Sequence, residues 1–158
     1  MELSTIGYEG MSLSTFLSTL RQYHIATLVD VRQNPISRKP GFSKTALSNA
    51  LQLNGFEYLH LYELGAPRNI RNDYKSDNDW NRYTVGYLQH LAEQDEPIAR
   101  LLKLAISKHC CLLCFESDPQ TCHRYFVANE LVRQGRGQLS IQHIRIENQV
   151  AQQALHLA

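Results

Sequence analysis

The sequence predicts a single α/β domain: a three-layer α/β/α arrangement around a mainly parallel sheet of about five strands. Short apolar or alternating segments, typical of strands, alternate along the chain with longer segments whose apolar residues have helical spacing. The chain has 158 residues, which is near the usual size of one domain and enough to bury a core. We find no internal repeat and no low-complexity tract, so residues 1–158 are expected to form one domain with a short tail at 147–158.

Five segments are predicted as strands. Residues 27–32 are apolar and β-branched until they end in Asp30 and Arg32, which period-two alternation places on one face. Residues 109–115 are hydrophobic enough for a strand buried on both faces. In chain order, the predicted strands are residues 3–8, 27–32, 56–62, 109–115 and 139–146.

The helices alternate with these strands. Ser12 or Ser14 is expected to cap the first helix, whose apolar positions run from Leu13 to Leu20, and Ser43 to cap the second. The predicted helices after the first are residues 43–53, 83–93, 97–108 and 119–134.

Two segments lack such a pattern. Residues 33–42 are predicted as a basic loop, because their prolines oppose regular structure. Residues 69–81 are polar and weakly patterned, and are expected to form a lid or a surface excursion.

The overall charge excludes several classes of partner. With 16 Lys and Arg against 15 Asp and Glu, nothing favours a general polyanion binder, so attraction for phosphate must be local. No segment approaches the length of a membrane span, and we expect a cytoplasmic protein with no membrane partner. The four cysteines lie between Cys110 and Cys122 and are expected as free thiols, with Cys110 and Cys111 on opposite faces of a strand.

Four short motifs are expected to meet at one edge of the sheet. Loops that follow parallel strands collect at the carboxyl edge, where open α/β sheets bind ligands. That edge would gather Gly7-Tyr8, Asp30-Val31-Arg32, Glu63-Leu64-Gly65 and the segment 114–124. The last of these is the segment densest in reactive side chains, with two thiols, a carboxylate, an imidazole and a guanidinium.

At these motifs, together with Cys114-x-Glu116-x5-Cys122-His123-Arg124, the chain resembles the domain-of-unknown-function family number 488 over about residues 3–146. The first motif has Tyr8 where many members carry a His. The resemblance implies an intracellular α/β domain, mainly prokaryotic, and brings no activity with it. Some relatives carry DNA-repair labels.

The arginines predict an anion site. Arg32, Arg38, Arg68 and Arg124 are expected to converge near a helix amino terminus, where guanidinium forks and free amides bind phosphate oxygens. Alternatively, Arg32 pairs with Asp30 or Glu116, and Arg124 with Glu63, as buried braces. The complete predicted ligand-binding set is Tyr8, Asp30, Arg32, Arg38, Glu63, Arg68 and Arg124.

Glu116, Cys122 and His123 are the predicted catalytic residues. Cys122 near a helix start is a candidate nucleophile or a packed structural thiol. If both residues lie on a helix, His123 points about 100° away from Cys122 and is poorly placed as its base. A metal site at Cys114, Cys122 and His123, perhaps with Glu116, is an alternative, but the spacing lacks paired Cys-x2-Cys hooks, so no metal ligand is assigned.

The sequence therefore predicts a domain that binds a phosphate-bearing ligand, a nucleotide or a nucleic-acid end, at the carboxyl edge of the sheet. Whether it also hydrolyses that ligand or transfers a group from it is left open by the sequence. A non-catalytic binding module and a thiol-based metal or redox site are the alternatives. Neither the cofactor nor the oligomeric state follows from the sequence.

Overall fold

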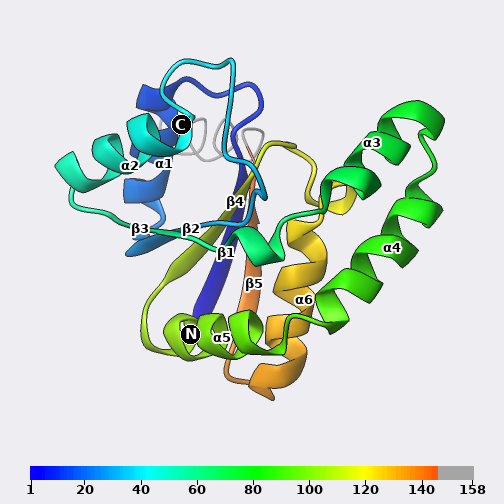
Figure 1. Ribbon diagram of the computed structural model, residues 1–158. Coiled ribbons are helices and arrows are strands. Elements are labelled where there is room, and N and C mark those ends of the chain that lie inside the picture. Colours follow the sequence, from blue (N-terminus) through cyan, green and yellow to red (C-terminus); the bar gives the residue numbers. More distant parts are fainter. Residues whose placement is uncertain (146–158) are drawn as a thin grey trace, which may run out of the picture.

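A computed structural model describes residues 1–145 as one parallel sheet covered by helices on both faces (Figure 1). The prediction of a three-layer α/β domain with about five strands is confirmed, and the described sheet is entirely parallel. The strand order, which the sequence left open, is β3-β2-β4-β1-β5. The predicted tail at 147–158 and the last residue of the predicted strand 139–146 lie outside the described residues.

The strands form where apolar segments were predicted. Their bounds are β1 Glu2–Gly7, β2 Thr27–Asp30, β3 Glu57–His60, β4 Cys110–Cys114 and β5 Ser140–Ile144. The central strands β2, β4 and β1 are buried almost throughout, whereas β3 and β5 at the edges are half-exposed. This difference explains why β4, a central strand, is a continuous apolar segment in the sequence, whereas the edge strands alternate.

The helices divide into two layers. Their bounds are α1 Leu13–Gln22, α2 Lys44–Leu53, α3 Arg68–Asp77, α4 Trp80–Ala92, α5 Asp95–Ser107 and α6 Arg124–Gly135. Helices α1 and α2 bury apolar residues against one face of the sheet, and α4, α5 and α6 against the other. Cys110 belongs to the second of these cores and Cys111 to the first, so the prediction that they face opposite ways is confirmed.

The segment 69–81 differs from its prediction. It is mostly the helix α3, which lies beside α4 as an outlying pair (Figure 1). Of the α3 side chains, only Ile70 and Tyr74 pack against the core, so its hydrophobic periodicity is too weak to detect. Asn78 ends α3 in the left-handed conformation, and the Asp79 side chain caps α4.

The predicted helix 119–134 also begins later than expected. Pro119–Thr121 forms a short 3-10 turn, Cys122 is extended, and α6 starts at Arg124. Cys122 therefore precedes the helix. This change of backbone direction sets the position of its thiol.

Candidate functional site

A cavity of about 560 Å³ opens at the carboxyl edge of the sheet. We call it the carboxyl-edge cavity. Its walls come from the segments after β1, β2 and β4 and from the facing sides of α3 and α4. Its charged and reactive lining residues are Arg32, Arg38, Arg71, Lys75, Cys114, Glu116 and His123, with Tyr8, Tyr74, Trp80, Tyr83 and Phe115 as aromatic walls.

Two glycines of the predicted motifs allow the walls to approach closely. A Cβ on Gly7, the last residue of β1, would lie 1.7 Å from the carbonyl oxygen of Glu116. A Cβ on Gly65 would lie 2.1 Å from the backbone nitrogen of Gln33. Both positions therefore need glycine because backbone from another loop occupies the side-chain space.

Arg32 is committed to its neighbours within the fold. Its Nε and Nη2 donate to the two carboxylate oxygens of Asp30 at 2.9 and 2.7 Å, and its Nη1 donates to the Phe42 carbonyl oxygen at 2.8 Å. The Tyr58 hydroxyl also donates to Asp30, at 2.6 Å. Burial opposes the guanidinium charge, but Asp30 outweighs it and raises the pKa of Arg32. The alternative in which Arg32 pairs with Asp30 as a buried brace is confirmed.

Arg124 is fully buried and lies outside the lining of the cavity. Its Nη1 donates to the Glu116 carbonyl oxygen at 2.6 Å, and its Nη2 donates to that of Ser117 at 3.4 Å. Its Nε has no hydrogen-bond partner within the described chain, and no ion pair to a described carboxylate is formed. The expected Arg124–Glu63 brace is thus not formed.

The four predicted arginines do not converge. Of them, Arg32 and Arg38 line the cavity, whereas the exposed Arg68, at the first residue of α3, does not. Glu63 is also absent from the lining, and its carbonyl oxygen accepts a hydrogen bond from His90 Nε2 at 2.7 Å. Tyr8, Glu116 and His123 do line it, and Asp30 lies behind it through its pair with Arg32.

Two cations that the sequence reasoning missed come from α3. Arg71 donates from Nε to the Ala66 carbonyl oxygen at 3.0 Å and from Nη2 to the Gln33 side chain at 2.8 Å. Arg71 and Lys75 are spaced four residues apart, so they share one face of α3. Recognising 69–81 as a helix would have placed both residues together.

Cys114, Cys122 and His123 meet in a buried cluster beside the cavity. The Nδ1 atom of His123 lies 3.8 Å from Cys114 Sγ and 3.9 Å from Cys122 Sγ. The helical geometry expected to separate Cys122 from His123 does not apply, because Cys122 is extended with φ −137° and ψ 142°. Glu116 Oε2 lies 3.5 Å from Cys114 Sγ.

The cluster shifts the protonation of its members. Burial, followed by the negative charge at Cys122, raises the pKa of Glu116 to about 7. Burial opposes a thiolate at Cys122, but Cys114, His123 and Arg124 together lower its pKa well below the ordinary value. The hydrogen bond with Cys122, and burial, raise the pKa of Cys114. The pKa shifts of the two thiols are therefore opposite in direction, and Cys122 is the more acidic of the two.

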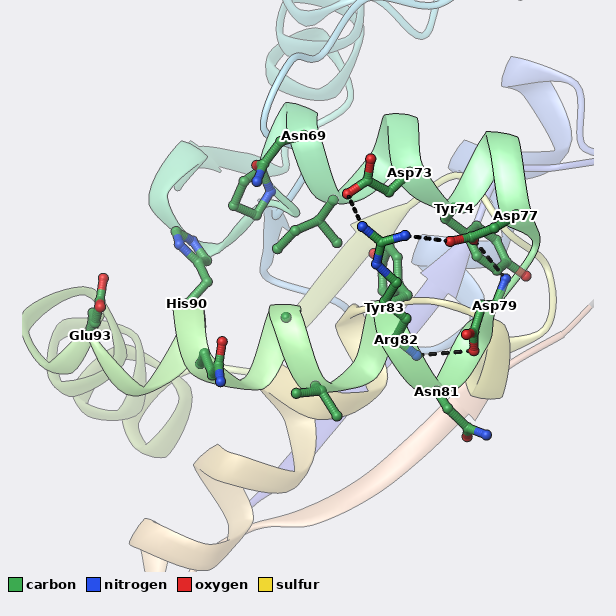
Figure 2. A pocket seen from close by; sticks show the side chains of 15 residues that line it. Asn69, Asp73, Tyr74, Asp77, Asp79, Asn81, Arg82, Tyr83, His90 and Glu93 are labelled. Atoms are coloured by element: carbon green, nitrogen blue, oxygen red, sulfur yellow. Dashed lines mark hydrogen bonds and ion pairs between the residues drawn. The ribbon is translucent and has the colours of Figure 1, made fainter.

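A second hollow lies between α3 and α4 (Figure 2). Its volume is about 820 Å³, and the guanidinium of its lining residue Arg82 is engaged by two of the lining carboxylates. Arg82 reaches across to Asp73 and Asp77 at 3.2 and 2.9 Å, as the dashed lines in Figure 2 show. Exposed ion pairs of this kind contribute little free energy. The carboxyl-edge cavity, which residues of the sequence motifs line, is therefore the candidate functional site.

The fold is that of an α/β protein whose described sheet is entirely parallel and has a cavity at its carboxyl edge. The chain belongs to the family described as Domain of unknown function DUF488, whose model matches residues 12–131. Comparisons with curated proteins and with solved structures found no match. None of the described helices is long and apolar enough to cross a membrane.

Proposed function

We propose that this protein binds a phosphate-bearing ligand, a nucleotide or the end of a nucleic acid, in the carboxyl-edge cavity. The observation that carries the proposal is Arg71, a half-buried guanidinium that lines the cavity and has no carboxylate partner in the described chain. A guanidinium has five N–H donors, and only two of those of Arg71 are used by Ala66 and Gln33. The remaining donors suit phosphate oxygens.

Two further cations support an anionic ligand. Arg38 and Lys75 line the same cavity, are exposed, and make no side-chain hydrogen bond or ion pair within residues 1–145. Among the lining residues that the structure describes, Glu116 is the only carboxylate, so this part of the cavity has a positive balance of charge. Such a local balance attracts phosphate although the whole chain is nearly neutral.

The aromatic side chains suit a base attached to that phosphate. Phe115 is 44% exposed, with its ring edge-on to that of Tyr8. Trp80 stacks on Tyr83 with 4.6 Å between ring centroids. Base–aromatic stacking contributes about 1–3 kcal/mol per base and tolerates any base.

Binding is tested by thermal shift and calorimetry with inorganic phosphate, sugar phosphates, nucleotides, and oligonucleotides that carry a 5′ or 3′ phosphate. The double variant Arg38→Gln/Lys75→Gln removes two exposed cations of the cavity. The control Arg100→Gln/Lys103→Gln removes two exposed cations of α5 with the same change in net charge. We expect the first variant, and not the control, to weaken binding at least about tenfold and to reduce its salt dependence. A panel without any binder, or equal binding by both variants, would refute the proposal.

The proposal also includes hydrolysis or group transfer, because Glu116 and His123 line the cavity and Cys122 touches His123. Product release from the ligands that bind is to be measured in the wild type, Glu116→Gln and Cys122→Ser. Turnover lost in these variants with ligand binding retained is the expected result. Binding without turnover in the wild type would instead assign the domain as a non-catalytic binding module.

We also propose a cytoplasmic location for the protein, because its four cysteines are free thiols, which suit a reducing compartment.

A further inference from the structure

Two thiols and one imidazole form a compact set of donor atoms beside the carboxyl-edge cavity. Cys114 ends β4, Cys122 follows the 3-10 turn, and His123 precedes α6. Their Sγ and nitrogen atoms all lie within 4.8 Å of one another, and all three residues are buried. Three donor atoms therefore point toward a common centre from two segments of the chain.

The orientation of His123 is determined by its second nitrogen. Nε2 lies 2.6 Å from the Val31 carbonyl oxygen, which can only accept, so Nε2 is the donor in either protonation state. This hydrogen bond leaves Nδ1 facing both sulfur atoms. Metal-ligating histidines are held in the same way, with the distal N–H donated to a carbonyl or carboxylate.

The spacing of the donors is close to that of a tetrahedral site. Zinc lies about 2.3 Å from thiolate sulfur and about 2.0–2.1 Å from imidazole nitrogen, which separates sulfur and nitrogen ligands by about 3.6 Å. The two Sγ–Nδ1 distances here are 3.8 and 3.9 Å. The two sulfur atoms lie within 4.8 Å of each other, and binding would bring them to the separation of about 3.8 Å that two sulfur ligands of a tetrahedral zinc have.

The charges around the cluster also suit a divalent cation. When a divalent cation displaces the thiol protons and Glu116 is ionised, two thiolates and one carboxylate carry three negative charges, which the cation and the buried Arg124 guanidinium balance. Arg124 has no described carboxylate partner of its own, so the cluster supplies the compensation that its burial requires.

We propose that Cys114, Cys122 and His123 bind a thiophilic divalent cation, Zn²⁺, through two Sγ atoms and Nδ1. Soft sulfur and imidazole donors select zinc over magnesium or calcium. Binding releases to solvent the protons that these side chains carry. Three protein ligands leave the fourth position to water or substrate, as in catalytic zinc sites.

A water or substrate would reach the fourth position from the carboxyl-edge cavity, because Cys114, Glu116 and His123 all line it. The Glu116 carboxylate lies beside that position and can orient a metal-bound water. The cation site does not depend on the proposed phosphate ligand. The cobalt titration uses no phosphate ligand, and the phosphate-binding test changes only Arg38 and Lys75, so failure of either one leaves the result of the other unchanged.

The test uses untagged wild-type protein, reduced with a phosphine and freed of metal with a chelator. Titration with Co²⁺ should produce thiolate-to-cobalt charge-transfer absorption and tetrahedral visible bands that saturate at one equivalent per chain and disappear on adding Zn²⁺. Cys114→Ala and Cys122→Ala should weaken cobalt binding at least about a hundredfold. The control Cys110→Ala removes a buried thiol from the same strand and should bind cobalt as the wild type does.

Differential alkylation maps the ligands without any substitution, which covers variants that fail to fold. In the wild type, Zn²⁺ should protect Cys114 and Cys122 while leaving the labelling of Cys110 and Cys111 unchanged. Absence of the charge-transfer absorption in the wild type would overturn the proposal, and so would unchanged cobalt binding in both alanine variants. A Cys114–Cys122 disulfide formed in air by protein that takes up no cobalt would assign the pair to redox chemistry instead.

Discussion

At the scale of single residues, the candidate site depends on the absence of a side chain at Gly7. Gly7 has no side chain because the Glu116 carbonyl group occupies that space. The same carbonyl oxygen accepts the hydrogen bond from Arg124. Because Gly7 has no Cβ, the segment after β4 can pack against β1, and its Glu116 carbonyl oxygen lies where it accepts the hydrogen bond from Arg124.

Gly7→Ala should destabilise the protein by at least about 1–3 kcal/mol, because the new methyl group collides with backbone that cannot rotate away. Urea unfolding measures the loss. Gly135, in α6, serves as the control. In Gly135→Ala the new Cβ would lie 3.6 Å from the side chains of Leu102 and Leu139, an ordinary contact distance, so this variant should be neutral or slightly stabilising. Equal stability of the two variants would show that β1 and the segment after β4 are not in close contact.

The buried pair of Asp30 and Arg32 provides a second test. Arg32→Met leaves the fully buried Asp30 carboxylate without its cation and should cost about 3–5 kcal/mol in the free energy of unfolding. Arg82→Met removes the exposed ion pairs with Asp73 and Asp77 and should cost less than about 1 kcal/mol. Similar losses in the two variants would contradict the structural role assigned to Arg32.

At the scale of elements, the structure shows which serine caps α1, a choice between Ser12 and Ser14 that the sequence left open. The Ser12 side chain accepts a hydrogen bond from the Thr15 backbone nitrogen at 3.1 Å, so Ser12 is the cap. Ser14 is exposed within the first turn. The helix therefore begins one turn after the left-handed Gly10.

Ser12→Ala should lower the free energy of unfolding by about 1 kcal/mol, because the amide of Thr15 loses its acceptor. Ser14→Ala places a better helix former at an exposed position and should be neutral or slightly stabilising. Thermal and urea unfolding of both variants make the comparison. The opposite ranking would move the cap to Ser14.

The helix pair α3 and α4 contributes lining residues to the cavity, among them Arg71 and Lys75, that belong to none of the sequence motifs. Tyr74 and Trp80 pack edge to face, and Arg82 ties the two helices together by ion pairs. These contacts hold Arg71 and Lys75 against the carboxyl edge of the sheet. The polar segment that forms α3 becomes part of the candidate site because α3 packs against α4.

At the scale of the whole molecule, the dependence of stability on pH includes a contribution from His143 on β5. Its Nδ1 lies 2.7 Å from the Thr5 hydroxyl of β1. Burial and the charges of Arg124 and Arg145 lower the pKa of His143 below 6.5. The unfolded chain then binds more protons than the folded one as the pH falls through this range.

The stability contributed by neutral His143 should therefore be complete above pH 6.5 and lost as the pH falls through its folded pKa. The difference in unfolding free energy between about pH 7.5 and about pH 5.5 should be smaller in His143→Gln than in the wild type. His24→Asn removes an exposed imidazole at a left-handed residue that Asn tolerates, and serves as the control. An unchanged difference in His143→Gln would contradict the assignment.

Much of this fold was predictable because its signals are local. Strands, helices and caps follow from hydrophobic spacing and a few polar residues, and the parallel sheet follows from their alternation. The helix α3 escaped prediction because only two of its side chains pack on the core. The predicted helix 119–134 included Cys122 because nothing in the local pattern shows that a 3-10 turn and an extended Cys122 precede α6.

The sequence by itself determined the class of fold, the five strands and the segment 114–124 as the densest group of reactive side chains. It also marked Gly7 and Gly65 as motif residues without showing what approaches them. Only the tertiary structure decided that Arg32 and Arg124 are internal, that Arg71 and Lys75 line the cavity, and that His123 faces both thiols. The physical reason is that these distances depend on strand order and on close backbone contacts between loops, neither of which is encoded in the spacing of residues along one segment.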